Sequence, residues 1–142
     1  MVAAMEISAL VEHRSGEHAA TVATNGSEQP VAIPGKSLGF GSAVNGGELL
    51  FLALATCYCN DLYREAKKRG IEIERVRVEV RGEFGGEGQA ARDVTYQAQV
   101  TAKASQQEIL DLMRHTDTVA EIHNTLRAGS PVVLTGCEAR SV

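Results

Sequence analysis

Hydrophobic and polar residues alternate strictly in two segments near the middle of the chain. In residues 73–84, Val76, Val78 and Val80 fall on one side of an extended chain and charged residues fall on the other. Residues 94–102 repeat this alternation, and the glycine-rich stretch 85–92 separates the two segments. A period of two with one charged face is typical of a half-buried antiparallel strand. The pattern therefore predicts a β-hairpin over residues 73–102.

Shorter apolar runs occupy the N-terminal part of the chain, at residues 4–13, 18–24 and 29–33. Arg14-Ser15-Gly16 separates the first two runs, and Asn25-Gly26, a strong hairpin signal, separates the last two. We expect three short strands here. The following segment, residues 34–47, is rich in glycine and is predicted to be a loop.

The hydrophobic period changes to that of a helix in residues 48–70, ELLFLALATCYCNDLYREAKKRG, which end at Gly70. Residues 49–55 are apolar on every side, and such a helix must be covered from several directions. A single small domain offers too little surface for this, so we expect a homodimer.

Two further helices are predicted after the hairpin. Ser105 with Glu108, and Thr118 with Glu121, each form a capping-box pattern before an apolar run, and Gly129 ends the second helix. Residues 130–142 are predicted to form a last short strand with a polar tail. Because strands and helices come in blocks rather than in alternation, the fold class is α+β, and we expect one domain over residues 1–142.

The composition of the chain indicates which binding partners and which cellular compartment to expect. The net charge of -4 argues against nucleic acid or an anionic membrane as a partner. No apolar run approaches the ~18 residues of a membrane span, and the N-terminus does not resemble a signal peptide. The three cysteines suggest no disulfide framework, so we expect a cytoplasmic protein.

Cys57 and Cys59 are the candidate reactive residues. On a helix, residues two apart differ by about 200° and point to opposite sides, so these two thiols can form neither a mutual disulfide nor a shared zinc site. Cys59 shares its face with apolar residues and is interpreted as a small buried side chain. Cys57 shares its face with Asp61 and Arg64 and is the better candidate for chemistry.

A reactive thiolate needs a cation or hydrogen-bond donors nearby. The candidates in the sequence are Arg14, Arg64 and His123, whereas Glu48 is interpreted as a favourable charge at the start of the helix. The other histidines show no spacing to cysteines or carboxylates that suggests a metal site. We therefore expect neither a metal nor a cofactor.

The chain resembles the OsmC/Ohr superfamily of small thiol proteins, most specifically in residues 45–84, NGGELLFLALATCYCNDLYREAKKRGIEIERVRVEVRGEF. The resemblance implies an intertwined homodimer of two-layer subunits, with central cysteine-bearing helices flanked by antiparallel sheets. It places Cys57 at the position of the peroxidatic cysteine. It places Glu48 at the acidic residue that holds the active-site arginine, and Arg14 at that arginine.

One position departs from the family pattern. The reductases of the family carry a second, resolving cysteine followed by proline, but Ala120 and Glu121 stand there in this sequence. Shifting the register by three residues places His123 there instead. Cys137 is the only other thiol that could act as the resolving cysteine, since Cys59 matches no catalytic position of the family.

Two functions remain open at this point. The first is reduction of organic hydroperoxides or other electrophiles by Cys57, assisted by Arg14 and Glu48, with His123 lining the pocket and an external thiol as reductant. The alternative is a non-enzymatic protein that binds a small hydrophobic ligand at the dimer interface.

Overall fold

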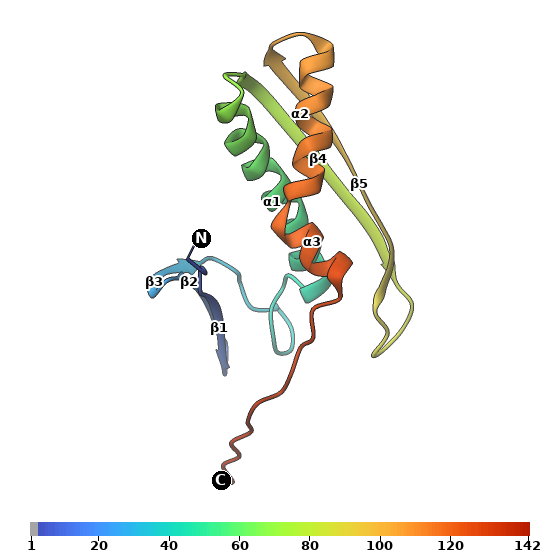
Figure 1. The fold of residues 1–142 in the computed structure, drawn as a ribbon. Coiled ribbons are helices and arrows are strands. Elements are labelled where there is room, and N and C mark those ends of the chain that lie inside the picture. The colour runs from blue at the N-terminus through green and yellow to red at the C-terminus, as the bar shows by residue number, and fades with distance from the viewer. Residues whose placement is uncertain (1–2) are drawn as a thin grey trace. The chain divides into compact units, whose positions relative to one another are not determined.

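The computed structural model describes residues 3–142, which form two compact units that divide between Leu49 and Leu50. Figure 1 gives the order of the elements, three strands, a long helix, a hairpin and two shorter helices. The structure confirms the α+β class predicted from the sequence.

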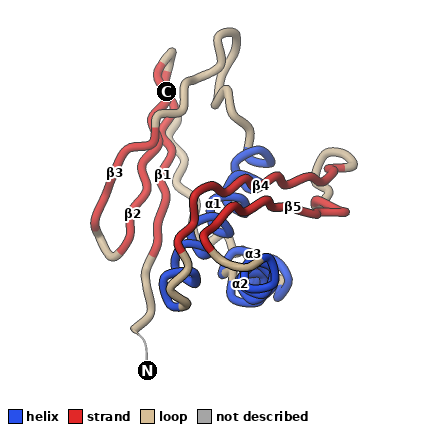
Figure 2. Tube along the Cα trace, turned by 90° about the horizontal axis from the view of Figure 1, so that it is seen from above, coloured by secondary structure: helices blue, strands red, loops and turns tan. Residues whose placement is uncertain are grey.

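The first unit is built around a three-stranded antiparallel sheet in the order β1-β2-β3. Its strands are β1 (Ile7–Arg14), β2 (Glu17–Thr24) and β3 (Ser27–Val31). The predicted turn is confirmed: Asn25 and Gly26 both have positive φ, 48° and 81°, as a two-residue hairpin turn requires. The three strands run side by side in Figure 2.

The second unit contains most of helix α1 (Gly46–Lys68) and the predicted hairpin of β4 (Glu72–Phe84) and β5 (Ala91–Lys103). Val76 pairs with Val100 and Val78 with Ala98, which places these apolar side chains on one face of the hairpin. Helices α2 (Gln106–Val119) and α3 (Glu121–Ala128) follow. Buried residues of α1 and α2 pack together against apolar residues of the hairpin, and Figure 1 shows both helices alongside the β4–β5 ribbon.

The core of this unit lies between α1, α2 and the hairpin. Leu62 of α1 and Leu112 of α2 are fully buried there, and burial of each side chain contributes about 1.5–3 kcal/mol. Tyr58 belongs to the same cluster, and its hydroxyl donates a hydrogen bond of 2.8 Å to the carbonyl of Met113. This bond fixes the middle of α1 against the middle of α2.

Of the two predicted capping boxes, one is present in the structure and the other is not. Ser105 and Glu108 form the expected capping box at the start of α2, so this prediction is confirmed. The second capping box, at Thr118, is wrong. The Thr118 hydroxyl donates to the carbonyl of His115 within α2, and Ala120 is the N-cap of α3 without a side-chain cap.

The predicted last strand is also wrong. Residues 130–142 form no regular secondary structure in this chain. Val132, Val133 and Leu134 are strongly exposed, because the segment has no neighbouring strand with which to pair.

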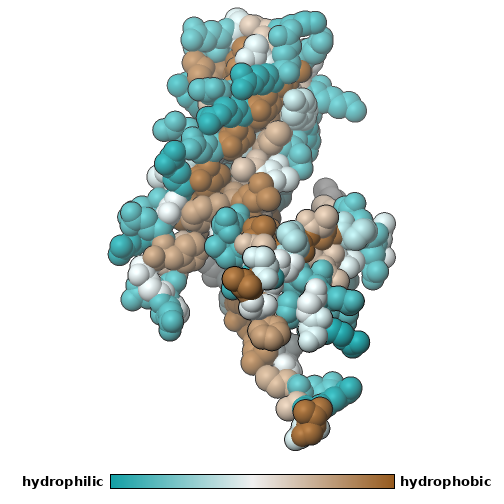
Figure 3. All heavy atoms as spheres, turned by 180° about the vertical axis from the view of Figure 1, so that it is seen from behind, coloured by the Kyte–Doolittle hydropathy of each residue, from teal (hydrophilic) through white to brown (hydrophobic). Residues whose placement is uncertain are grey.

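Several large apolar side chains reach the surface, as the brown patches in Figure 3 show. In the first unit, Ile7, Leu10 and Val11 of β1 are 68, 58 and 60% exposed. On α1, Leu52 is 59% exposed although it lies in the segment predicted to be covered. None of the helices described is long and apolar enough to span a membrane.

Candidate functional site

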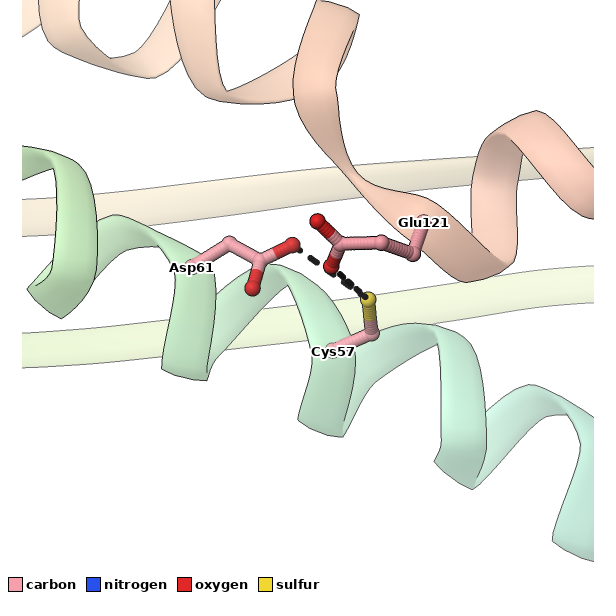
Figure 4. A group of neighbouring side chains, drawn as sticks. All are labelled: Cys57, Asp61 and Glu121. Carbon is pink, nitrogen blue, oxygen red and sulfur yellow. Dashed lines mark hydrogen bonds between the residues drawn. The ribbon is translucent and has the colours of Figure 1, made fainter. Parts of the chain in front are cut away.

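The Cys57 thiol lies between two carboxylates. Cys57 and Asp61 are one helical turn apart on α1, and Glu121 is the first residue of α3. The Cys57 Sγ donates to Asp61 Oδ2 at 3.4 Å and lies 3.8 Å from Glu121 Oε1, as the dashed lines in Figure 4 show. Asp61 is only 6% exposed and Cys57 is half-buried. The geometry is therefore that of a protonated thiol with acceptors on two sides.

These surroundings raise the pKa of Cys57 above its ordinary value. Burial of the thiol is the largest cause, and the negative charges of Asp61 and Glu121 add to it. The backbone N–H of Ile122, at the start of α3, acts in the opposite direction by stabilising the thiolate. Within the second unit, Cys57 at rest is therefore a protonated thiol. The Ile122 N–H is already positioned to stabilise the thiolate when the proton leaves.

Arg64 was predicted as a candidate cation for the thiolate, but it binds the carboxylates instead. Its Nη1 lies 3.0 Å from Asp61 Oδ1 and 2.9 Å from Glu121 Oε2, the oxygens that do not face Cys57. Its Nε pairs with Glu65 Oε2 at 2.8 Å. Arg64 thus compensates the acidic groups and holds Glu121 of α3 against α1.

Asp61 is the group best placed to receive the thiol proton. Burial raises the pKa of its carboxyl, and the negative charge of the neighbouring Glu121 raises this pKa further. A carboxylate whose pKa is raised toward neutrality is a better proton acceptor than an exposed one. The contact of 3.4 Å with Sγ allows the transfer without rearrangement of the helix.

His123 lies in the wall of an apolar cavity of about 680 Å³ in the second unit. Its side chain is 5% exposed, its ring packs against Tyr58 and Tyr96, and among the described residues neither ring nitrogen has a hydrogen-bond partner. Burial lowers the pKa of His123, and the charge of Arg127 lowers it further. The imidazole is therefore held in its neutral form. The apolar walls of the cavity include Leu50, Leu54, Val80, Phe84, Val94 and Leu126.

The other predicted site residues have separate environments. Arg14 ends β1 and is exposed. Glu48 lies in the first turn of α1, where its carboxylate accepts from the N–H of Asn45 and its own N–H donates to the Asn45 side chain. Cys59 is half-buried rather than buried, and Cys137 is exposed in the C-terminal segment. The pairing of Glu48 with Arg14 stays a prediction.

Sequence reasoning found Cys57 and the polar face of α1 but did not place Glu121 beside the thiol. Asp61 carries a sequence signal, since residues four apart share a helix face. Glu121 is distant in the chain and meets Cys57 only because α3 turns back against α1. Only the tertiary structure could reveal this contact.

Comparison with known proteins places the chain in a family. Residues 39–135 match the model of the OsmC-like proteins, and this stretch runs across both units. A search of curated proteins finds no match.

Several solved structures share the fold at low sequence identity. The OsmC-like protein from Mycoplasma pneumoniae is 18% identical with a TM-score of 0.62, and 91% of each chain is covered. An OsmC-like hydroperoxide resistance protein from Jannaschia sp. is 13% identical with a TM-score of 0.53, covering 92% of this chain and 91% of that one. The organic hydroperoxide resistance protein OhrB of Bacillus subtilis is 17% identical with a TM-score of 0.50, covering 86% of this chain and 92% of that one.

At these identities the solved structures establish the fold alone, whereas the family model matches more than half of the sequence. The cysteine-bearing helix α1 lies inside the matched region. This chain belongs to the OsmC family.

Proposed function

We propose that this protein is a cytoplasmic thiol-dependent reductase of organic hydroperoxides or related electrophiles, with Cys57 as its reacting group. The observation that carries the proposal is the environment of Cys57, where an acceptor for the thiol proton and a donor for the thiolate converge on one sulfur. The structural similarity to hydroperoxide resistance proteins from Jannaschia sp. and Bacillus subtilis supports the reaction class.

The proposed reaction consumes one hydroperoxide and two external thiols. The Cys57 sulfur attacks the distal peroxide oxygen, the O–O bond breaks, and the thiol proton passes through Asp61 to the departing alkoxide. The products are an alcohol and a Cys57 sulfenic acid. A first external thiol condenses with the sulfenic acid to give a mixed disulfide and water, and a second thiol restores Cys57 and leaves as a disulfide.

The external thiol is required because Ala120 stands where a resolving cysteine is expected from the family resemblance. Ala120 is fully buried between α2 and α3 and offers no sulfur. The proposal keeps Arg14 as the cation that favours the thiolate, and Glu48 as the residue that orients Arg14, in the homodimer. The exposed apolar side chains of β1 support the homodimer, since a second copy is one surface that could cover them.

Intact-mass analysis after graded additions of an organic hydroperoxide tests this function. We expect Cys57 to gain the mass of one oxygen and to over-oxidise with excess oxidant, because no neighbouring thiol captures the sulfenic acid. A small thiol should then give a mixed disulfide at Cys57 and slow turnover. Cys57→Ser is the matched control, and Arg14→Ala should slow the first oxidation.

Two results would contradict the scheme. A disulfide between Cys57 and Cys137 would show a relocated resolving cysteine. Absence of oxidation at Cys57 would favour the second candidate function, binding of a small hydrophobic ligand. That alternative is supported by the apolar cavity at His123, whose volume of about 680 Å³ is in the range of small-molecule sites.

A further inference from the structure

Two histidines face each other across the first hairpin. His13 of β1 and His18 of β2 are direct partners in the strand register, one pair away from the Ser15-Gly16 turn. Their Nδ1 atoms are 3.3 Å apart, and their ring centroids are 5.5 Å apart. The sequence spacing of five residues gives no metal motif, so the pair becomes visible only through the register of the sheet.

The hydrogen bonds around the pair assign a proton to each ring. The backbone N–H of Gly41 donates to His13 Nε2 at 3.4 Å, so that nitrogen carries no hydrogen. The His13 proton must therefore be on Nδ1, where it donates to Nδ1 of His18. His18 in turn carries its proton on Nε2. In this arrangement the Nδ1 of His18 is the acceptor that faces His13.

The spacing of the two nitrogens fits a shared metal ion. Zinc binds histidine nitrogens at about 2.0–2.1 Å in tetrahedral geometry, which separates two ligand nitrogens by about 3.3–3.4 Å. The observed separation of 3.3 Å falls at this value. Neutral imidazole nitrogens are also the ligands that such ions prefer.

The pair is accessible and lies among compensating charges. His13 and His18 line an open, mostly polar hollow of about 950 Å³ at the end of the hairpin, together with Glu12, Glu17 and Arg14, so the two acidic residues outnumber the one basic residue. An ion bound there would keep open positions for water or for a small-molecule carboxylate or thiol. The hairpin holds both ligands on neighbouring strands, so little side-chain freedom is lost on binding.

We propose that His13 and His18 form a two-histidine site for a divalent late transition metal ion of the zinc class, bound through both Nδ1 atoms. Binding requires the His13 proton to move from Nδ1 to Nε2. His13 Nε2 then carries a hydrogen and can no longer accept from the Gly41 N–H, so this hydrogen bond must break. Metal binding is therefore coupled to release of the glycine-rich loop at Gly41, without net loss of a proton from the pair.

A competing cluster exists in the second unit. Ligand atoms of Cys57, Asp61 and Glu121 lie within 4.8 Å of one another. Arg64 already binds both carboxylates there, so a cation would have to displace its guanidinium group. The histidine pair carries no such competing charge in direct contact with the facing nitrogens, and this favours the hairpin.

Titration of the full chain with Zn²⁺, followed by calorimetry and by NMR of the histidine rings and the Gly41 amide, tests the proposal. We expect one zinc ion per chain at the hairpin, shifts of both Nδ1 resonances, and a shift of the Gly41 amide. His13→Gln and His18→Gln should each weaken binding at least tenfold. His115→Gln is the matched control, since His115 pairs with Glu65 elsewhere, and should leave the affinity unchanged.

The two histidine variants alter partly or fully exposed side chains, and circular dichroism will show that they fold. Unchanged zinc affinity in both variants would overturn the site. Loss of binding in Cys57→Ser but not in the histidine variants would place the ion at the competing cluster and also overturn it. A Gly41 amide that does not respond to bound zinc would refute the coupling to the loop.

Discussion

Removing the charge of Asp61 should make Cys57 more reactive toward an alkylating agent. In Asp61→Asn the carboxylate 3.4 Å from the Cys57 sulfur is replaced by a neutral amide of the same shape. Asp61 is buried and Cys57 is half-buried, but Arg64 compensates much of the Asp61 charge, so an effective dielectric constant of about 40–80 gives an interaction of about 1.2–2.4 kcal/mol. This corresponds to a fall in the Cys57 pKa of about 1–2 units.

The expected rate follows from two opposing effects. Each unit of lower pKa raises the thiolate fraction near neutral pH about tenfold but lowers the intrinsic nucleophilicity about threefold. The net gain at pH near 7 is therefore about 3- to 12-fold. With hydroperoxide the gain should be smaller than with iodoacetamide, because Asp61→Asn also removes the acceptor of the thiol proton.

The assay is the rate of iodoacetamide alkylation against pH, in a background of Cys59→Ser and Cys137→Ser so that only Cys57 reacts. Asp111→Asn removes an exposed carboxylate of α2 that is not among the causes of the Cys57 shift, and it should leave the profile unchanged. A Cys57 pKa that stays the same or rises in Asp61→Asn would refute the electrostatic reasoning.

Two further predictions concern stability and assembly. Hydrogen bonds from Arg64, Lys68 and His115 lower the pKa of Glu65 to about 2. Because this pKa is lowered, the stabilisation is complete above the ordinary glutamate pKa and is lost as the pH falls toward 2, so urea unfolding of Glu65→Gln should show a deficit at pH 7 that disappears in acid. Sedimentation should show a homodimer at micromolar concentration; a well-folded monomer would contradict the proposed covering of the apolar faces of α1 and β1.

The strands and helices that depend on local patterns could be predicted from the sequence. The alternation of Val76 and Val78 with charged residues specifies which face of β4 is buried, and Ser105 with Glu108 specifies where α2 starts. Thr118 shows the limit of such patterns, since its hydroxyl has a competing acceptor in the preceding turn that the motif does not reveal. The predicted C-terminal strand is wrong for a related reason, because a strand requires a neighbour and residues 3–142 supply none for this segment.

The candidate site was predictable only in part. Cys57 and Asp61 are one helical turn apart, so their proximity follows from the helix alone. Glu121 joins them through tertiary packing, and the pairing of His13 with His18 depends on the hairpin register. In both cases the separation of the two residues along the sequence does not indicate a contact. The contact can be recognised only from the three-dimensional structure.

The opposite orientations of Cys57 and Cys59 on α1 have a consequence for the kinetics of the proposed cycle. The thiol that is nearest in sequence cannot supply electrons to Cys57, because it points about 200° away around the helix. Regeneration is then a bimolecular step, and its rate scales with the concentration of free thiol around the protein. The oxidised fraction of Cys57 would therefore follow the ratio of peroxide to thiol in its surroundings. In the proposed cycle, this fraction reports how oxidising the compartment around the protein is.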